Sequence, residues 1–383
     1  MRVTRDDALA FRAAAHNLSV RRPVADLHEI VSRAPVRNAP PGTAHIALGA
    51  RLEGVTKEIV ETALLVDKTL IQVWSRRGTP HVILTRDMAV FTTGLLPDDD
   101  DSVRHVLEPF TATLDEKGIS ALEAFERVGR EAYAALGGKE MSRGEFSAAL
   151  SKRLPKDLTP WCDRCGAYHV NENAFRYTGL RGDFCLISAL DEKVRFMRLD
   201  KWLGRKKPRV AKRTARAEAV RRYLAAYGPS TSDEFADWVG TTPRWSERAW
   251  RLVDDDVVEV DVEGRRGWVL EADLPRLRAA ATIEGVRLLP AHDPYIAHPD
   301  RTQLVPIREH QKELWRPQVN PGAVLVNGAV VGAWRMQKKG RVLAVPVRLF
   351  KSVGKRTKDA VEAEAQIVAS LRSCTSARVG FVR

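Results

Sequence analysis

The side chains best suited to chemistry fall in two short segments, and the first holds two cysteines and a histidine. In "WCDRCGAYHV" the residues Cys162, Cys165 and His169 have the types and the Cys-x-x-Cys-x-x-x-His spacing of zinc ligands. A structural zinc site takes four protein ligands, and the next thiol along the chain, Cys185, does not follow at a usual spacing. The alternative is a pair of reduced thiols beside a helix N-terminus. We expect that alternative, so neither a metal nor another cofactor enters the predicted mechanism.

The second segment is a polar loop at the start of a helix, in "RAPVRNAPPGTAHIALGARL". Arg37 and Asn38 precede a Pro-Pro-Gly break, and Pro41 suits the first turn of a helix that runs to about Leu52. In such a loop Asn38 can cap the helix or bond its own backbone, which is a purely structural interpretation. A stiff polar loop at the mouth of a helix can also present a side chain to a substrate. Both interpretations stay open at this point.

The charge of the chain favours a polyanionic partner. The 383 residues include 62 Lys plus Arg against 49 Asp plus Glu, which gives a formal charge of +13. Such an excess suits nucleic acid or an acidic membrane surface. The N-terminus has no apolar segment of the signal-peptide kind, and no stretch of 18 or more apolar residues occurs, so we expect a cytoplasmic protein. Four cysteines in a chain of this length do not make a disulfide framework.

The first half of the chain repeats an order of several helices followed by paired strands. In residues 1–96 helical patterns lead into "TLIQVWSRRGTPHVIL", which alternates on both sides of a basic turn at Arg77-Gly78 and predicts a hairpin. In residues 97–200, after the acidic break "PDDDD", Ser142 and Glu145 form a capping-box pattern. Helices closed by a hairpin are the order of a winged helix. The expected helices cover a segment starting at Thr4 and residues 24–34, 41–52, 57–66, 102–117, 120–135 and 171–178, and the later strands lie near 183–188 and 194–199.

Residues 201–285 show the winged-helix order most clearly. Ser232 is placed to cap the first helix of a helix-turn-helix, Gly240 ends it, and Thr242 starts a candidate recognition helix. The following "VVEVDVEGRRGWVLE" predicts a wing with its tip at residues 264–267. The basic run from residue 201 to 222 at the entry to this unit fits the phosphate backbone of DNA.

The last part, residues 286–383, is predicted to be a β-rich region with a closing helix. Apolar runs in "LLPAHDPYIA", "AVLVNGAVVGAWR" and "GRVLAVPVRLF" read as strands, with a turn at Asn327-Gly328 and a helix over residues 355–372. The fold class expected for the whole chain is therefore α+β, with tandem winged-helix motifs followed by this region.

Four phrases together resemble one known family. "RRGTPHVIL", "YGPSTSDEFADWVG", "LLPAHDPYI" and "VLVNGAVVGAWR" are similar, in this order, to the winged-helix DNA glycosylases of the AlkZ and YcaQ type, over about residues 5–350. The resemblance implies a C-shaped scaffold around duplex DNA. It also implies excision of alkylated bases, including bulky N7-guanine adducts and crosslinks left by genotoxic natural products. Some members of the family are self-resistance proteins.

The resemblance also assigns catalytic candidates. In the family a Gln-x-Gln or Gln-x-Asp motif holds the attacking water, and the matching positions here are Arg37, Asn38 and Ala39. The outer residues depart from the motif, but the carbonyl oxygen of the Asn38 amide can hold a water. Asp293, in "HDPYI", matches a family motif near the cleft, although an Asp-Pro pair also simply makes turns. Asn38 is the first catalytic candidate and Asp293 the second.

The predicted partner is double-stranded DNA containing alkylated guanine, bound by a monomer and without a membrane. Exposed arginines at a turn are also common as solvated tips, and a histidine in a strand is commonly structural. The alternative function is a winged-helix regulator or shielding protein that binds DNA without chemistry. The predicted DNA-binding residues are Arg37, Arg76, Arg77, His81, Arg244, Arg265, Arg266, Lys338 and Lys339.

Overall fold

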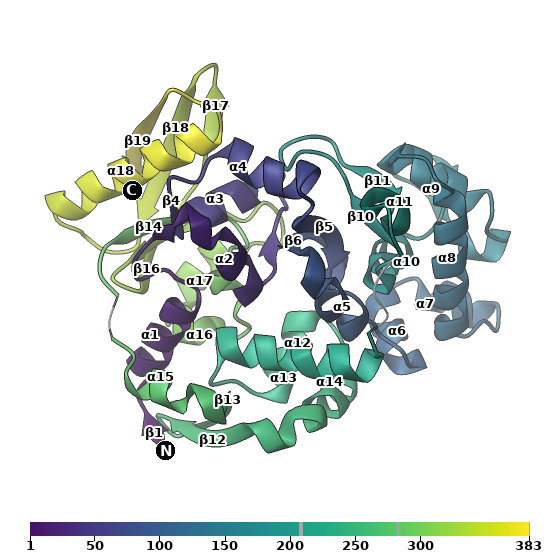
Figure 1. The fold of residues 1–383 in the computed structure, drawn as a ribbon, viewed down its shortest axis with the longest axis horizontal. Coiled ribbons are helices and arrows are strands. Elements are labelled where there is room, and N and C mark those ends of the chain that lie inside the picture. The colour runs from purple at the N-terminus through teal and green to yellow at the C-terminus, as the bar shows by residue number, and fades with distance from the viewer. Residues whose placement is uncertain (207–209, 282, 383) are drawn as a thin grey trace. The chain divides into compact units, whose positions relative to one another are not determined.

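The computed structural model describes residues 1–206, 210–281 and 283–382. Runs of helices and runs of strands both occur along the chain (Figure 1), which confirms the predicted α+β class. The chain divides into two compact units. Unit 1 comprises residues 1–62, 221–234 and 255–383, and unit 2 comprises residues 63–220 and 235–254. The division into four consecutive domains stays a prediction, because these units group segments by contact and not by their order in the chain.

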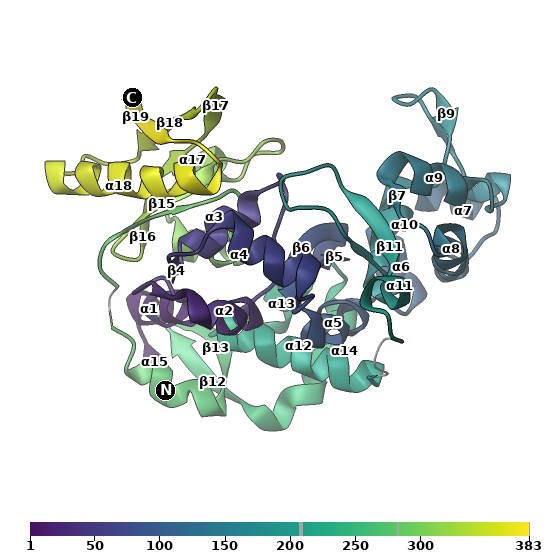
Figure 2. The same ribbon diagram turned by 45° about the horizontal axis from the view of Figure 1, so that its top comes forward.

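The C-terminal part of unit 1 is a sheet covered by one long helix, α18. Its strands follow the order β14-β15-β16-β18-β17, and β19 runs parallel to β18. Asn327 and Gly328 form the predicted turn between β15 and β16, and both have the positive φ, 48° and 80°, that a two-residue hairpin turn requires. Helix α18 packs on β14 and β19, and Figure 2 shows it beside β19, so the closing helix is confirmed. The strands predicted in "AVLVNGAVVGAWR" and "GRVLAVPVRLF" are present, whereas in "LLPAHDPYIA" only Leu288 and Leu289 belong to a strand. The bounds are β14 Val286–Leu289, β15 Gly322–Val326, β16 Ala329–Trp334, β17 Gln337–Lys339, β18 Val342–Leu349, α18 Lys355–Leu371 and β19 Ser376–Val382.

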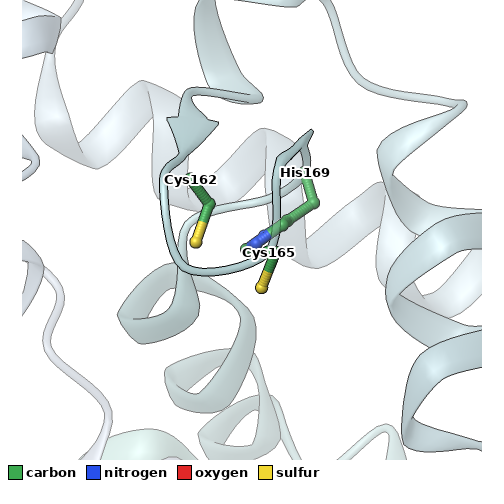
Figure 3. Close-up of side chains that lie close together, drawn as sticks. All are labelled: Cys162, Cys165 and His169. Atoms are coloured by element: carbon green, nitrogen blue, oxygen red, sulfur yellow. The ribbon is translucent and has the colours of Figure 1, made fainter.

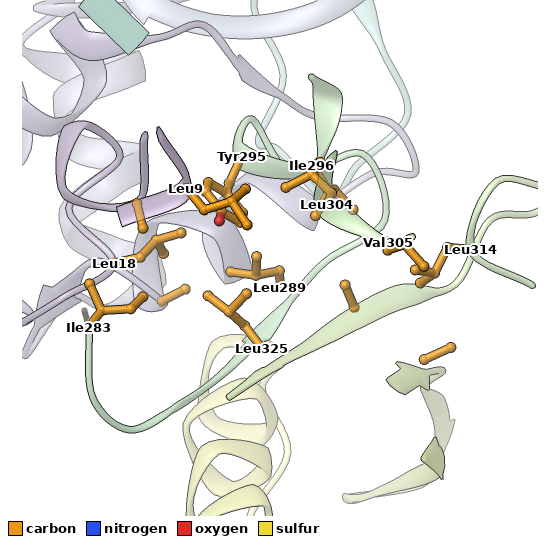
Figure 4. Close-up of a cluster of buried hydrophobic side chains, with 14 residues drawn as sticks. Leu9, Leu18, Ile283, Leu289, Tyr295, Ile296, Leu304, Val305, Leu314 and Leu325 are labelled. Atoms are coloured by element: carbon orange, nitrogen blue, oxygen red, sulfur yellow. The ribbon is translucent and has the colours of Figure 1, made fainter. Parts of the chain in front are cut away.

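Helix α1 joins two cores of unit 1. It covers Arg5–Ala15 and begins as predicted at Thr4, whose side chain forms a capping box with Asp7. Phe11 packs into a cluster with hairpin β12–β13, while Leu9 belongs to a larger cluster that contains Leu18, Leu289 and Tyr295 (Figure 4). Burial of apolar side chains on both sides of α1 thereby holds the hairpin and the C-terminal sheet in one unit.

Unit 2 contains a sheet in the order β6-β5-β10-β11-β7. Every residue of β5 is buried, and Trp74 from this strand meets the rings of Phe175, Phe184 and Phe196 edge-on at centroid distances of 5.0, 5.8 and 4.8 Å. The Ser142 capping box is confirmed. The helix predicted over 102–117 is divided into α6 and α7 by Pro109, and the other predicted elements are present. The bounds are β5 Leu70–Ser75, β6 Thr79–Leu84, α6 Asp100–Leu107, α7 Thr111–Glu116, α8 Ala121–Leu136, β7 Met141–Ser142, α9 Arg143–Ser151, α10 Glu172–Tyr177, β10 Phe184–Leu186 and β11 Arg195–Arg198.

Residues 212–270 follow the winged-helix order of three helices and a hairpin. Gly240 ends the second helix with φ of +82°, and Thr242 caps the third through the N–H of Trp245. Two details of the prediction are wrong. The cap of α13 is Thr231, which exchanges hydrogen bonds with Glu234, and the wing turns at Glu263-Gly264, so that Arg265 to Gly267 already belong to the strand. The bounds are α12 Lys212–Tyr227, α13 Ser232–Val239, α14 Pro243–Trp250, β12 Val257–Val262 and β13 Arg265–Leu270.

Shorter elements complete the described chain. The remaining helices are α2 Leu27–Arg33, α3 Thr43–Gly49, α4 Lys57–Glu61, α5 Met88–Phe91, α11 Leu199–Leu203, α15 Leu274–Arg278, α16 Arg301–Leu304 and α17 Arg308–Leu314, and the remaining strands are β1 Arg2–Val3, β2 Arg22–Pro23, β3 Val36–Arg37, β4 Leu52–Glu53, β8 Trp161–Cys162 and β9 Ala167–Tyr168.

Candidate active site and DNA-facing residues

The loop before α3 is held rigid by Asn38. This side chain is buried, and its Oδ1 accepts the backbone N–H groups of Gly42 at 2.9 Å and Ala44 at 3.4 Å. Gly42 occupies the N-cap position of α3 with φ of +82° and has no side chain to offer, so Asn38 supplies the cap from four residues earlier. Arg37 lies half-buried in β3 next to it. The side-chain oxygen of Asn38, which was predicted to hold the attacking water, therefore accepts hydrogen bonds from the start of α3.

A carboxylate that the sequence did not single out lies in the same part of unit 1. His45, fully buried on α3, places its Nε2 3.8 Å from Oε1 of Glu61 on α4. The ammonium of Lys57 lies 3.6 Å from the same oxygen. The Glu61 side chain is 21% exposed. A partly exposed carboxylate beside an imidazole can accept a hydrogen bond from water and can balance positive charge. Its sequence signal was a polar histidine within the apolar helix "TAHIALG".

Asp293 takes part in a buried ion pair. Its Oδ2 and Oδ1 accept the two Nη groups of Arg51 at 2.8 and 2.7 Å, and Oδ1 also accepts the backbone N–H of Tyr295 at 2.9 Å. Arg51 further donates to the carbonyls of His16 and Ala47. Both oxygens of Asp293 are engaged away from solvent, so this geometry counts against the catalytic role predicted for it and favours a structural one.

The arginines of hairpin β5–β6 do not form the exposed basic tip that was predicted. Arg76 is only 7% exposed, donates from Nη1 to the carbonyl of Trp238 at 2.9 Å, and lies 4.8 Å from the centre of that indole ring. His81 is fully buried, and its Nδ1 lies 2.8 Å from the carbonyl of Thr79. Arg77 is exposed but donates to the carbonyl of Asp237. Arg76 and His81 are thus packing residues of unit 2, because a buried side chain cannot face a phosphate.

In the wing, Arg265 is also not the free DNA-facing arginine that was predicted. Its guanidinium makes ion pairs with Asp300 and Glu234, both in unit 1. Because two carboxylates neutralise its charge, a DNA phosphate would have to displace them. The neighbouring Arg266 has a side chain that is 78% exposed, and its Nε lies 3.8 Å from Oε1 of Glu259.

The other predicted DNA-binding residues lie on the surface of their own units. Arg244 in unit 2 is exposed and lies 3.5 Å from Asp101. Lys338 and Lys339 are exposed on strand β17 of unit 1. Exposed pairs of this kind contribute little to stability, so such side chains can exchange a protein partner for a phosphate. Their DNA contacts stay predictions.

Comparisons with known proteins agree on one family. A model of the DNA glycosylase AlkZ-like family matches residues 34–371. An interstrand DNA cross-link repair glycosylase of Streptomyces sahachiroi is 34% identical over 156 residues, a match that covers 39% of this chain and 41% of that relative. The solved structure of the DNA glycosylase AlkZ from Streptomyces sahachiroi has the same fold, with a TM-score of 0.78 over 100% of both chains at 22% identity. Since the family model extends over most of its length, the chain belongs to the AlkZ-like DNA glycosylase family.

Proposed function

We propose that this chain is a monofunctional DNA glycosylase that hydrolyses the N-glycosidic bond of bulky N7-alkylguanine adducts in double-stranded DNA. The family match carries the proposal, because it includes the loop before α3 and both helices that hold His45 and Glu61. The name of one relative, an interstrand DNA cross-link repair glycosylase, supports cross-linked DNA as a substrate. Bulky N7-guanine adducts as substrates and self-resistance to an alkylating natural product follow from the family resemblance. The chain acts on DNA as a monomer. No helix in the described ranges is long and apolar enough to cross a membrane.

The chemistry suits the residues that are present. A guanine alkylated at N7 is cationic and leaves readily, so the enzyme needs a positioned water and stabilisation of the oxocarbenium-like charge on the sugar. Glu61 can supply both, because its carboxylate is partly exposed and lies beside His45. Asn38 acts through the loop: its cap on Gly42 and Ala44 keeps the start of α3, and with it His45, in place. The glutamines of the family motif are replaced here by Arg37 and Ala39.

The test is excision under single-turnover conditions. Duplex DNA containing 7-methylguanine, and a second duplex with a bulky N7 adduct, would be incubated with excess protein, and the released base and the alkali-labile abasic site would be measured. Glu61→Gln should lower the excision rate by on the order of a hundredfold while DNA affinity stays within a few fold. Asn38→Asp keeps an oxygen for the cap and should retain activity, whereas Asn38→Ala should lower it.

Glu58→Gln is the matched control, since Glu58 is exposed on the same helix, and it should excise at the wild-type rate. Equal rates for Glu61→Gln and wild type would remove Glu61 from the mechanism while leaving the activity in place.

A second candidate function is DNA binding without chemistry. The observation that favours it is that both predicted catalytic side chains, Asn38 and Asp293, are engaged by protein groups. The same assay decides, because a protein that only binds or shields DNA releases no base and leaves no abasic site from either duplex.

A further inference from the structure

Unit 2 carries a side-chain cluster that the proposed glycosylase reaction does not use. Cys162, Cys165 and His169 lie on and beside the small hairpin β8–β9, where Cys162 pairs with Ala167 across the strands. Each of the three offers one ligand atom, and these atoms all lie within 4.8 Å of one another (Figure 3). Two sulfurs bound to one tetrahedral zinc ion, each at about 2.3 Å, are separated by about 3.8 Å. A contraction of the cluster by about 1 Å therefore brings the three atoms to coordination distance.

The backbone between the cysteines is folded for this convergence. The N–H groups of Cys165 and Gly166 both donate to the carbonyl of Cys162, at 3.1 and 2.9 Å. Gly166 has φ of +59°, the left-handed conformation that glycine adopts without strain. The chain reverses its direction in this turn, and both sulfurs and the imidazole of His169 point into the same space (Figure 3).

The histidine is oriented as a metal ligand would be. The Nδ1–H of His169 donates to the carbonyl of Val170 at 2.8 Å, which leaves the lone pair on the buried Nε2. A backbone carbonyl that accepts the second ring N–H is the usual partner of a metal-bound histidine, because it fixes the tautomer and the ring orientation.

The hairpin is a small element whose own contacts give it little stability. Its strands β8 and β9 have two residues each and form a separate two-stranded sheet, which on its own is marginally stable in water. Trp161 and Tyr168 pack ring to ring at 5.0 Å, yet both are exposed. A bound metal would supply the folding energy that this apolar contact does not.

We propose that Cys162, Cys165 and His169 bind one zinc ion that holds the β8–β9 hairpin in its fold, with water as the fourth ligand. This reverses the expectation of reduced thiols without a metal, which rested on the missing fourth protein ligand. Structural zinc sites usually have four protein ligands, but catalytic zinc sites bind the ion with three protein ligands and a water, so three ligands are sufficient for binding. Thiolate and imidazole ligands select zinc over magnesium or calcium. The proposal is independent of the glycosylase reaction.

The first test is the metal content of the full chain. Protein produced with zinc in the medium and passed over a desalting column should contain about one zinc per chain by mass spectrometry of the metal. Cys165→Ser and His169→Ala should each reduce this content to near zero. Cys374→Ala and His105→Ala, which change a cysteine and an exposed histidine outside the cluster, should leave it unchanged. Zinc retained by both cluster variants would overturn the proposal.

The second test uses the wild-type chain and does not depend on the folding of a variant. Cobalt added to metal-free protein should give a sulfur-to-metal charge-transfer absorption that zinc then abolishes. Arg164, exposed in the turn between the cysteines, is a site for trypsin. Cleavage after Arg164 should be at least tenfold slower with zinc than with a chelator, while cleavage elsewhere changes little. A wild-type chain with no cobalt band and no zinc-dependent protection would not contain this site.

Discussion

Two basic hairpins look alike in the sequence and differ in the structure. "SRRGT" in the β5–β6 hairpin and "GRRGW" in the β12–β13 hairpin both place two arginines next to a turn between alternating strands. In the first hairpin Arg76 is buried under Trp238, whereas in the second Arg266 is 78% exposed. Between these extremes lies Arg265, which is partly exposed and paired with two carboxylates.

The difference shows that burial and partner determine what an arginine in a hairpin does. A guanidinium that is buried against a carbonyl and an indole contributes to stability. Its removal leaves the carbonyl without a hydrogen-bond donor and the indole ring without its packing partner. A guanidinium that stands in water contributes almost nothing to stability and keeps its charge available to a phosphate. The comparison can be tested by removing each arginine in turn.

The largest effect is expected for Arg76→Ala. It removes the hydrogen bond to the Trp238 carbonyl and the cation–π contact, so the free energy of unfolding should fall by about 2–4 kcal/mol. The measurement is the thermal unfolding midpoint of the purified chain. Arg76→Lys should lose less, because the charge remains but the planar guanidinium does not. Arg77→Ala at the next, exposed position is the control. An unchanged midpoint for Arg76→Ala would mean that Arg76 contributes as little to stability as the exposed Arg266.

An intermediate effect is expected for Arg265→Ala. Glu234 and Asp300 would lose the cation between them, and we expect a loss of about 1–2 kcal/mol. Asp300→Asn removes one of the two charges and keeps the oxygen that caps α16. Denaturant titrations of the two single variants and the double variant should show that their effects are not additive. Additive losses would mean that the ion pair does not form in solution.

The smallest effect on stability, within about 0.5 kcal/mol, is expected for Arg266→Ala. Its effect should instead appear in DNA binding, with affinity for duplex DNA reduced a few fold at low salt and the slope of log affinity against log salt reduced by about one. Fluorescence anisotropy with a labelled duplex at several salt concentrations measures both quantities. Should the slope stay the same while stability falls, Arg266 would be a structural residue like Arg76.

Most of the local interactions were predictable from the sequence alone. The helix starts at Thr4 and Thr242, the capping box at Ser142 and the Asn327-Gly328 turn all formed as expected, whereas the cap of α13 is Thr231 and not Ser232. Each depends on groups within a few residues of one another, so the local residue types are sufficient to specify it. The zinc-ligand spacing of Cys162, Cys165 and His169 could be recognised in the sequence for the same reason. Zinc binding was not predicted, because a fourth protein ligand is missing.

Only the tertiary structure decided which polar side chains face solvent. Asp293 and Arg51 lie 242 positions apart, and Arg76 and Trp238 lie 162 positions apart, so no local pattern indicates that they meet. The same holds for His45 and Glu61, which come from separate helices. An exposed turn and a buried one share the same residue preferences, because backbone conformation sets those preferences. Burial depends instead on which distant elements pack over the turn, and the long-range contacts that determine this exist only in the folded chain.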